Sequence, residues 1–206
     1  HRDPMGKPRT LLGRRLRRLG DKLRYLKDYR AFRDQQRGAT SGFEPLRWSE
    51  RYPIVGEWTS ETRFDTHYTY HPAWAARILA QTRPREHVAI SSSVAFVAIA
   101  SAFVPLRFYD YRPANSRLSG LTTDRADLLS LPFPDDSLPS LSCMHVVEHV
   151  GLGRYGDPLD VDGDLKAMRE LARVVAPGGD LLFVVPVGRQ RVEFNAHRVY
   201  ACETVI

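Results

Sequence analysis

Short apolar runs alternate with helix-forming segments in the second half of the chain, and this alternation limits the folds that the chain can adopt. Residues 87–91 read HVAIS and residues 181–185 read LLFVV, without the polar alternation of a half-exposed strand. Strands that are apolar on both faces are typical of a parallel sheet that helices cover on both sides. The sequence therefore predicts an α/β fold, a Rossmann-like, doubly wound and mostly parallel sheet, over residues 84–206.

The expected elements follow one another in strand–helix order. We expect strands at residues 87–91, 106–109, 121–123, 138–145 and 181–185, and helices at residues 72–82, 94–103 and 165–175. In the last helix, Asp164 is the expected N-cap, and Pro-Gly-Gly at 177–179 is the turn that follows. In such sheets, ligands bind beyond the carboxyl ends of the strands, where the strand order reverses.

The positive charge of the chain is concentrated at its N-terminus. Residues 1–37 hold 13 Lys and Arg against 4 Asp, whereas the remainder holds 17 Lys and Arg against 20 Asp and Glu. Leucines at a helical spacing form one stripe among these basic residues: Leu12, Leu16, Leu19, Leu23 and Leu26. Residues 11–36 therefore predict a basic amphipathic helix. It would lie on an anionic membrane surface, dock on a partner protein, or pack on its own domain with a solvated arginine face.

Several functional classes are disfavoured by composition. No nucleic acid partner is expected, because the basic charge ends at Arg37 and no aromatic-basic RNA-binding signature follows. The longest apolar run, residues 94–106, is too short to span a bilayer. Two cysteines do not make a disulfide framework. We therefore expect a cytoplasmic protein, with peripheral membrane attachment as the alternative. Residues 38–83 are expected to form an aromatic-rich connector and lid helix between the basic appendage, residues 1–37, and the α/β domain.

Three motifs carry a resemblance to known proteins. Residues 127–137 (DLLSLPFPDDS), 147–149 (VEH) and 173–179 (RVVAPGG) resemble the middle and late motifs of class I S-adenosylmethionine-dependent methyltransferases. Three longer stretches resemble a methyltransferase-like family known as domain of unknown function 268: residues 145–158, 162–179 and 194–200. The resemblance covers roughly residues 60–206 and implies a class I methyltransferase fold. That fold would need one more helix and a closing strand pair, so the chain, which also begins at His1, is expected to be truncated.

The resemblance implies a site for the cofactor S-adenosylmethionine. Asp110, which closes the second strand, would bind the ribose hydroxyls, and Asp127 would contact the adenine amino group. A turn or cap role is the alternative for both residues. The first loop, where Ser91 and Ser93 would approach the cofactor, departs from the family because it has serines in place of glycines. Glycine takes a positive φ without strain and serine does not. We also expect His145 beside the cofactor.

The acceptor side of the site is expected beyond the fourth and fifth strands. His149 is the first choice of general base and His145 the second, because imidazole titrates near neutral pH. The expected acceptor-binding residues are Arg154, Tyr155, Asp157, Asn195, His197 and Arg198. His197 is a further candidate base.

Two functional classes and one remote alternative remain. The first is an S-adenosylmethionine-dependent methyltransferase that O-methylates a small-molecule or glycan acceptor. Its rival is a non-catalytic methyltransferase-like scaffold or binding domain, which the serine loop favours. The remote alternative is a zinc hydrolase, because His145, Glu148 and His149 read H-x-x-E-H.

Overall fold

The computed structural model describes residues 11–38 and 42–205, and the chain divides into two compact units. We call His1–Arg63 the N-terminal unit and Phe64–Ile206 the α/β unit. This boundary differs from the expected ones after residues 37 and 83. The aromatic segment belongs to the N-terminal unit, and the helix that follows it belongs to the α/β unit. Residues 1–10 of the expected basic appendage lie outside the described residues.

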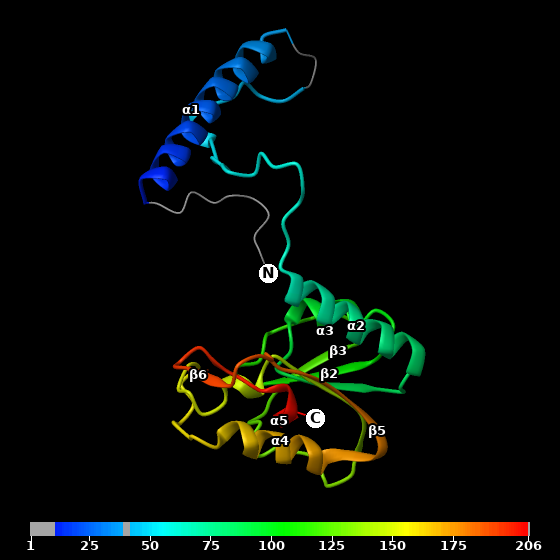
Figure 1. Cartoon of the computed structure of the whole chain (residues 1–206). Helices are drawn as coiled ribbons and strands as arrows, with labels where there is room; N and C mark the ends of the chain where they lie inside the picture. The colour runs from blue at the N-terminus through cyan, green and yellow to red at the C-terminus, as the bar shows by residue number, and fades with distance from the viewer. Residues whose placement is uncertain (1–10, 39–41, 206) are drawn as a thin grey trace. The chain divides into compact units, whose positions relative to one another are not determined.

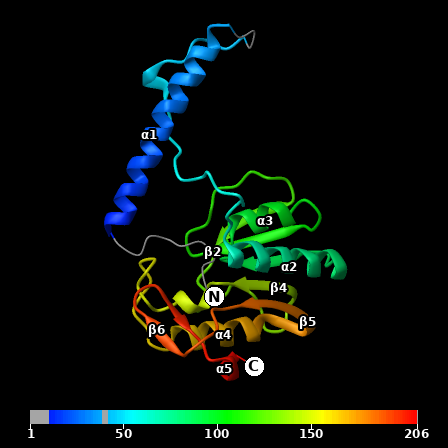
Figure 2. The same ribbon diagram turned by 45° about the horizontal axis from the view of Figure 1, so that its top comes forward.

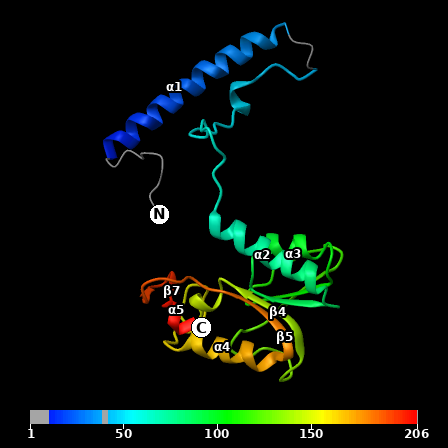
Figure 3. The ribbon, with the colours of Figure 1, turned by 45° about the vertical axis from the view of Figure 1, so that its right-hand side comes forward.

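The N-terminal unit consists of one long helix and the segment that runs back beside it (Figure 3). The helix is α1 (Leu11–Gln36), and a 3-10 turn, η1 (Trp48–Glu50), follows in the returning segment. The rings of Tyr29 and Trp48 meet edge to face, with centroids 5.0 Å apart, and the Arg24 guanidinium lies 4.2 Å from the centre of the Trp58 ring. The predicted basic helix is thus confirmed, and aromatic side chains hold the returning segment against it.

The leucine stripe of α1 is only partly covered. Leu16, Leu19 and Leu23 are 60%, 56% and 61% exposed, whereas Leu26 is half-buried. The side chain of Leu12 lies outside the described part of the chain. Within the N-terminal unit, the returning segment therefore leaves these three leucines exposed.

The α/β unit is built on a five-stranded parallel sheet in the order β3-β2-β1-β4-β5. Its strands are β1 (His87–Ile90), β2 (Leu106–Asp110), β3 (Leu121–Arg125), β4 (Leu138–Met144) and β5 (Val175–Val184). The chain moves outward from β1 to β3 and then returns to the other side of β1 with β4. The strand order therefore reverses between β1 and β4, as a doubly wound sheet requires.

Helices cover both faces of this sheet. In all three views, α2 (Thr66–Thr82) and α3 (Val94–Ala100) lie on one side and α4 (Gly163–Val174) lies on the other (Figures 1–3). Successive residues of β1 point to opposite faces: Ala89 packs with α2 and α3, whereas Val88 and Ile90 pack with α4. The predicted Rossmann-like α/β fold is thus confirmed.

Small elements complete the α/β unit. They are the 3-10 turn η2 (Val147–His149), the antiparallel pair β6 (Arg191–Glu193) and β7 (His197–Val199), and the short helix α5 (Cys202–Val205). Figure 2 shows β6 near the α4 side of the sheet. Among the residues that the structure describes, no helix is both long and apolar enough to cross a membrane.

The structure corrects the expected start of α2. This helix begins at Thr66 rather than at Pro72, because the Asp65 carboxylate accepts a hydrogen bond from the Tyr68 backbone N–H and caps it. Pro72 lies inside the helix, where it removes only one backbone donor. Tyr68 and Tyr70, two of the aromatic residues that suggested a connector, lie in the first two turns of α2.

Two corrections concern the region around α4. Its N-cap is Asp162, and Asp164 lies in the first turn, where its carboxylate accepts a 2.9 Å hydrogen bond from the Tyr200 hydroxyl. Pro-Gly-Gly at 177–179 is not a turn between elements but lies within β5, where the pairing with β4 shifts register. Leu138 is opposite Val175, and Ser140 is opposite Asp180.

Candidate functional site

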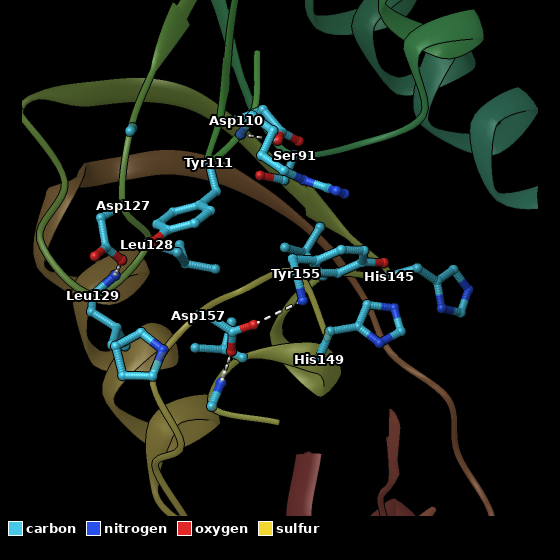
Figure 4. Close-up of a pocket in the computed structure, with 16 residues that line it drawn as sticks. Ser91, Asp110, Tyr111, Asp127, Leu128, Leu129, His145, His149, Tyr155 and Asp157 are labelled. Carbon is cyan, nitrogen blue, oxygen red and sulfur yellow. Dashed lines mark hydrogen bonds between the residues drawn. The ribbon is translucent and has the colours of Figure 1, made fainter. Parts of the chain in front are cut away.

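A pocket of about 180 Å³ lies beyond the carboxyl ends of β1, β2 and β4. Figure 4 shows Ser91 and Asp110 on one side of it, Asp127 on another, and His149 and Tyr155 facing them. These residues come from segments far apart in the chain, and the parallel sheet brings them together because all its strands end at one edge. The pocket is where the strand order predicts a ligand site.

Ser91 reaches this pocket in a strained backbone conformation. It follows β1 with φ 49°, a left-handed value that glycine adopts freely and serine does not, and its N–H donates a 2.7 Å hydrogen bond to the Tyr109 carbonyl. Ser93 has φ −57°, begins α3, and is not among the residues that line the pocket. Serine in place of glycine is therefore strained at Ser91, whereas the prediction that Ser93 approaches the cofactor is not supported, because Ser93 does not line the pocket.

The two aspartates expected to bind cofactor both line the pocket. One oxygen of Asp110 accepts a 2.7 Å hydrogen bond from the Arg112 N–H, and one oxygen of Asp127 accepts a 2.9 Å bond from the Leu129 N–H. Each aspartate therefore makes the local turn that was its alternative role. Within residues 11–38 and 42–205, the second oxygen of each carboxylate has no hydrogen-bond partner, so each can still accept a bond from a ligand.

His145 and Glu148 form a hydrogen-bonded pair behind the pocket. His145 lines the pocket directly after β4, with φ 56°. Its Nδ1 lies 2.9 Å from Oε1 of Glu148, whose side chain is 1% exposed. Within the described chain, His145 Nε2 and Glu148 Oε2 are buried polar atoms without a hydrogen-bond partner. Such atoms are rare in native proteins, because each costs the free energy of its lost hydration.

His149 is held by the chain on both sides of its ring. Its Nδ1 lies 2.7 Å from the Ala196 carbonyl oxygen, and its Nε2 lies 4.0 Å from Glu148 Oε1. Burial lowers the pKa of His149, against the opposing effects of Glu148 and the Ala196 carbonyl. The His149 imidazole is therefore less readily protonated than an imidazole in water.

The expected acceptor residues divide into two groups. Tyr155 lies at the rim, with the guanidinium carbons of Arg112 and Arg154 4.5 and 5.1 Å from its ring centre. Asp157 also lines the pocket and accepts hydrogen bonds from the N–H groups of Gly151, Gly153 and Tyr155. Burial alone would raise the pKa of Asp157, but these bonds outweigh burial and lower it.

The second group lies on or beside β7. The prediction that Arg198 faces the mouth is wrong: this side chain is buried and donates to the carbonyl oxygens of Val150, Asp160 and Val161. Asn195 is exposed and does not line the pocket. The His197 ring lies 6.4 Å from that of His149, and its Nε2 is 3.5 Å from Glu193.

The geometry does not support the zinc alternative. Within the described ranges, no group of three His, Cys, Asp or Glu side chains could hold a metal ion. Glu148 is instead engaged by His145, which fixes its carboxylate between the two histidines.

Sequence reasoning missed the contribution of α2 to this site. The rings of His67, Tyr68 and His71 lie 6.0, 5.8 and 4.9 Å from the ring of His145. Their spacing of one and three residues places them on one helix face, and Asp65 three residues before Tyr68 is a capping signal. Those two signals could have identified this face of α2.

One family model matches part of the chain. Residues 136–204 match the family model described as "Caenorhabditis protein of unknown function, DUF268". The predicted resemblance is confirmed over this segment. The domain of unknown function 268 match covers β4, η2, α4 and β5, and therefore includes His145, Glu148 and His149. No curated protein matches the chain.

Solved structures resemble the chain at low identity. The YcgJ protein from Bacillus subtilis is 21% identical, with a TM-score of 0.38, over 53% of this chain and 49% of that one. A complex between the Haloferax volcanii Trm112 methyltransferase activator and a protein described as a methyltransferase contains a chain that matches at 17% identity, with a TM-score of 0.36. The match covers 54% of this chain and 58% of that one. A Methanococcus maripaludis protein described as an S-adenosyl-L-methionine-dependent methyltransferase is 17% identical, with a TM-score of 0.36, over 56% of this chain and 55% of that one. The chain thus spans about half the length of the structures that it matches.

Proposed function

We propose that the α/β unit binds S-adenosylmethionine in this pocket and supports methyl transfer to an oxygen of a small-molecule or glycan acceptor. The observation that carries the proposal is Asp110, which ends β2 at the pocket with one carboxylate oxygen unpartnered among the described residues. A carboxylate in this position can accept hydrogen bonds from the two hydroxyls of a ribose.

The other lining residues fit the remaining parts of the cofactor. Asp127 offers an acceptor oxygen for an adenine amino group, and Ala126 and Leu128 beside it are buried apolar residues that can pack against the base. Ser91 brings the backbone between β1 and α3 to the edge of the pocket. The cofactor, when bound, supplies an electrophilic methyl group on a sulfonium. The chain's own residues orient the reactants, exclude water and accept the proton of the acceptor hydroxyl.

The proposal is tested by the substitution Asp110→Asn. We expect isothermal titration calorimetry to show S-adenosylmethionine binding to the wild type and at least tenfold weaker binding to Asp110→Asn. The loss corresponds to about 1.5–3 kcal/mol, because a hydrogen bond to a charged group contributes that much.

Asp124→Asn provides the matched control. Asp124 lies on the neighbouring strand, is exposed, and does not line the pocket. Equal losses in the two variants would disprove the ribose assignment. Absence of binding by the wild type would remove the enzyme proposal and favour a non-catalytic scaffold, for which the strained Ser91 in place of glycine is the supporting observation.

A further inference from the structure

A 2.9 Å hydrogen bond joins His145 Nδ1 to Glu148 Oε1 in the buried pair, and the tautomer of His145 decides its direction. We assign Nδ1 as the donor, because an ionised carboxylate only accepts hydrogen bonds. In the neutral imidazole, the proton is then absent from Nε2, which retains a lone pair. Nε2 is the buried atom that has no hydrogen-bond partner within the described residues. In this tautomer, the pair leaves His145 Nε2 without a hydrogen-bond partner among the described residues.

The groups around that nitrogen come from two elements. His67, Tyr68 and His71 of α2 contact the His145 ring, and Glu148 and His149 of η2 lie on its Nδ1 side. Tyr68 is 57% exposed, so its ring can turn away without opening the core. Burial raises the pKa of the Tyr68 phenol, so the ring stays neutral beside the histidines. The first turns of α2 thus cover His145 with the rings of His67, Tyr68 and His71.

His149 does not present its ring in the same way. Its Nδ1 donates to the Ala196 carbonyl, and the remaining Nε2 is directed to within 4.0 Å of the Glu148 carboxylate. Both of its nitrogens therefore face the chain. Of the two ring nitrogens that make no hydrogen bond within the described part of the chain, His149 Nε2 lies near a carboxylate, whereas His145 Nε2 is covered by the α2 rings, so an acceptor reaches it only when one of these rings moves aside.

We infer that His145 is the residue that accepts the proton of the acceptor hydroxyl, that Glu148 is its positioning residue, and that the acceptor binds against the α2 face formed by His67, Tyr68 and His71. This inference rests on the proposed methyl transfer. The acceptor oxygen forms the new carbon–oxygen bond, the carbon–sulfur bond breaks with its electron pair kept on sulfur, and the hydroxyl proton moves to His145 Nε2. The imidazolium is then stabilised by Glu148, as in other carboxylate–histidine pairs.

The first test uses the ring nitrogens of the full chain, labelled with ¹⁵N at histidine. In neutral conditions, we expect His145 to show a protonated Nδ1 and an unprotonated Nε2, and Glu148→Gln to lose this single tautomer. The fully buried His87, which lies at the opposite end of β1 between Ser140 and Ser142, is the internal control and should not change. A protonated Nε2 in the wild type, or an unchanged His145 spectrum in Glu148→Gln, would overturn the inference.

The second test measures access to Nε2 from the α2 side. Diethylpyrocarbonate reacts with unprotonated imidazole nitrogen, and Tyr68→Ala should increase modification of His145 about tenfold or more while His87 stays unmodified. No increase would show that the acceptor does not enter past α2. Both readouts are independent of S-adenosylmethionine titration, so failure of cofactor binding and failure of this inference can be distinguished.

The third test is kinetic and uses tritium-labelled S-adenosylmethionine with a panel of catechols, phenols and hexoses. For an acceptor that the wild type methylates, His145→Gln should lower kcat by about a hundredfold or more, and Glu148→Gln should lower it by a smaller factor. The KM for S-adenosylmethionine should change less than twofold. Unchanged kcat in either variant would contradict the assigned role. If the wild type methylates none of these acceptors, the ring spectra and the modification rates decide the inference.

Discussion

At the scale of single residues, Ser91 has a backbone conformation that is unfavourable for a residue with a side chain. Its φ of 49° is a conformation that costs serine about 1 kcal/mol relative to glycine. We predict that Ser91→Gly relieves this strain, whereas Ser93→Gly, at φ −57°, gains nothing and only adds freedom to the unfolded chain. The free energy of unfolding, measured in urea, should therefore be about 1 kcal/mol higher in Ser91→Gly than in Ser93→Gly. Equal values would mean that the Ser91 backbone is not strained in solution.

His87 should make the stability of the α/β unit depend on pH. Burial lowers the pKa of this histidine to about 4, from about 6.5 in an unfolded chain. Above pH 6.5 both states are neutral, and the full stability is present. As the pH falls from 6.5 to 4, only the unfolded state binds the proton, so stability decreases by at most roughly 3 kcal/mol. Urea unfolding of the wild type should show this slope, and His87→Gln should show a shallower one. An identical slope in both would assign the effect to other groups.

Asp110 could be predicted from the sequence, because a residue that ends a parallel strand lies at the ligand edge wherever the sheet is formed. Asp127 lies two residues beyond β3 and was expected only because the resemblance implies it. Glu148 could not be predicted in the same way. Its role depends on burial by segments that are distant in sequence, and no local pattern indicates which glutamate will be enclosed. The predicted position of Arg198 was wrong for the same reason, because the carbonyl groups to which it donates are at least 37 residues away in the sequence.

At the scale of elements, β1, β2 and β4 were predicted closely, whereas the starts of β5 and α2 were not. The all-apolar strands are set by their own composition, but α2 begins with exposed aromatic residues whose pattern is that of a surface segment. Its fully buried residues are Ala75 and Leu79, and Ala76 and Ile78 are partly buried against the same core. These apolar residues all lie in the second half of α2, so the helical period does not show in its first turns. The aromatic turns that precede them were therefore assigned to a connector, although they carry the side chains that cover His145.

The contact between β7 and the start of α4 should contribute strongly to stability. Arg198 is buried, donates to three carbonyl oxygens, and lies 3.4 Å from the Asp164 carboxylate. We expect Arg198→Met to lower the free energy of unfolding by about 3–5 kcal/mol, because Asp164 and the carbonyl groups lose their partner in the interior. Arg191→Met, which removes an exposed pair with Glu193, is the control and should cost less than about 1 kcal/mol. Similar losses in thermal or urea unfolding would show that the Arg198 contacts are not formed.

At the scale of the whole molecule, the two units should separate by deletion. A chain that begins at Phe64 retains the whole sheet, both of its cores and the pocket. We expect it to fold with a cooperative thermal transition and to bind S-adenosylmethionine as the full chain does, while losing the affinity of the full chain for anionic vesicles. We expect the exposed Leu16, Leu19 and Leu23 and the arginines of α1 to supply that affinity.

Vesicle sedimentation at low salt measures the second part of this prediction, since screening is weakest there. Neutral vesicles provide the control. Absence of binding by the full chain would exclude the membrane role of α1 and leave a partner protein as its target. Loss of the cooperative transition in the shortened chain would show that the α/β unit depends on residues 1–63.

The boundary between the two units lies next in sequence to the α2 residues that cover His145, the proposed general base. The N-terminal unit ends at Arg63, Asp65 caps α2, and His67, Tyr68 and His71 follow within its first two turns. A membrane or partner protein that binds the N-terminal unit and thereby alters the start of α2 would also shift the α2 rings that cover His145. Linkage between two binding sites is reciprocal. If the target of the N-terminal unit changes the affinity for the acceptor by some factor, an acceptor that displaces Tyr68 changes the affinity of the N-terminal unit for that target by the same factor. The short segment from Arg63 to His71 would then make this chain sensitive to where it is anchored.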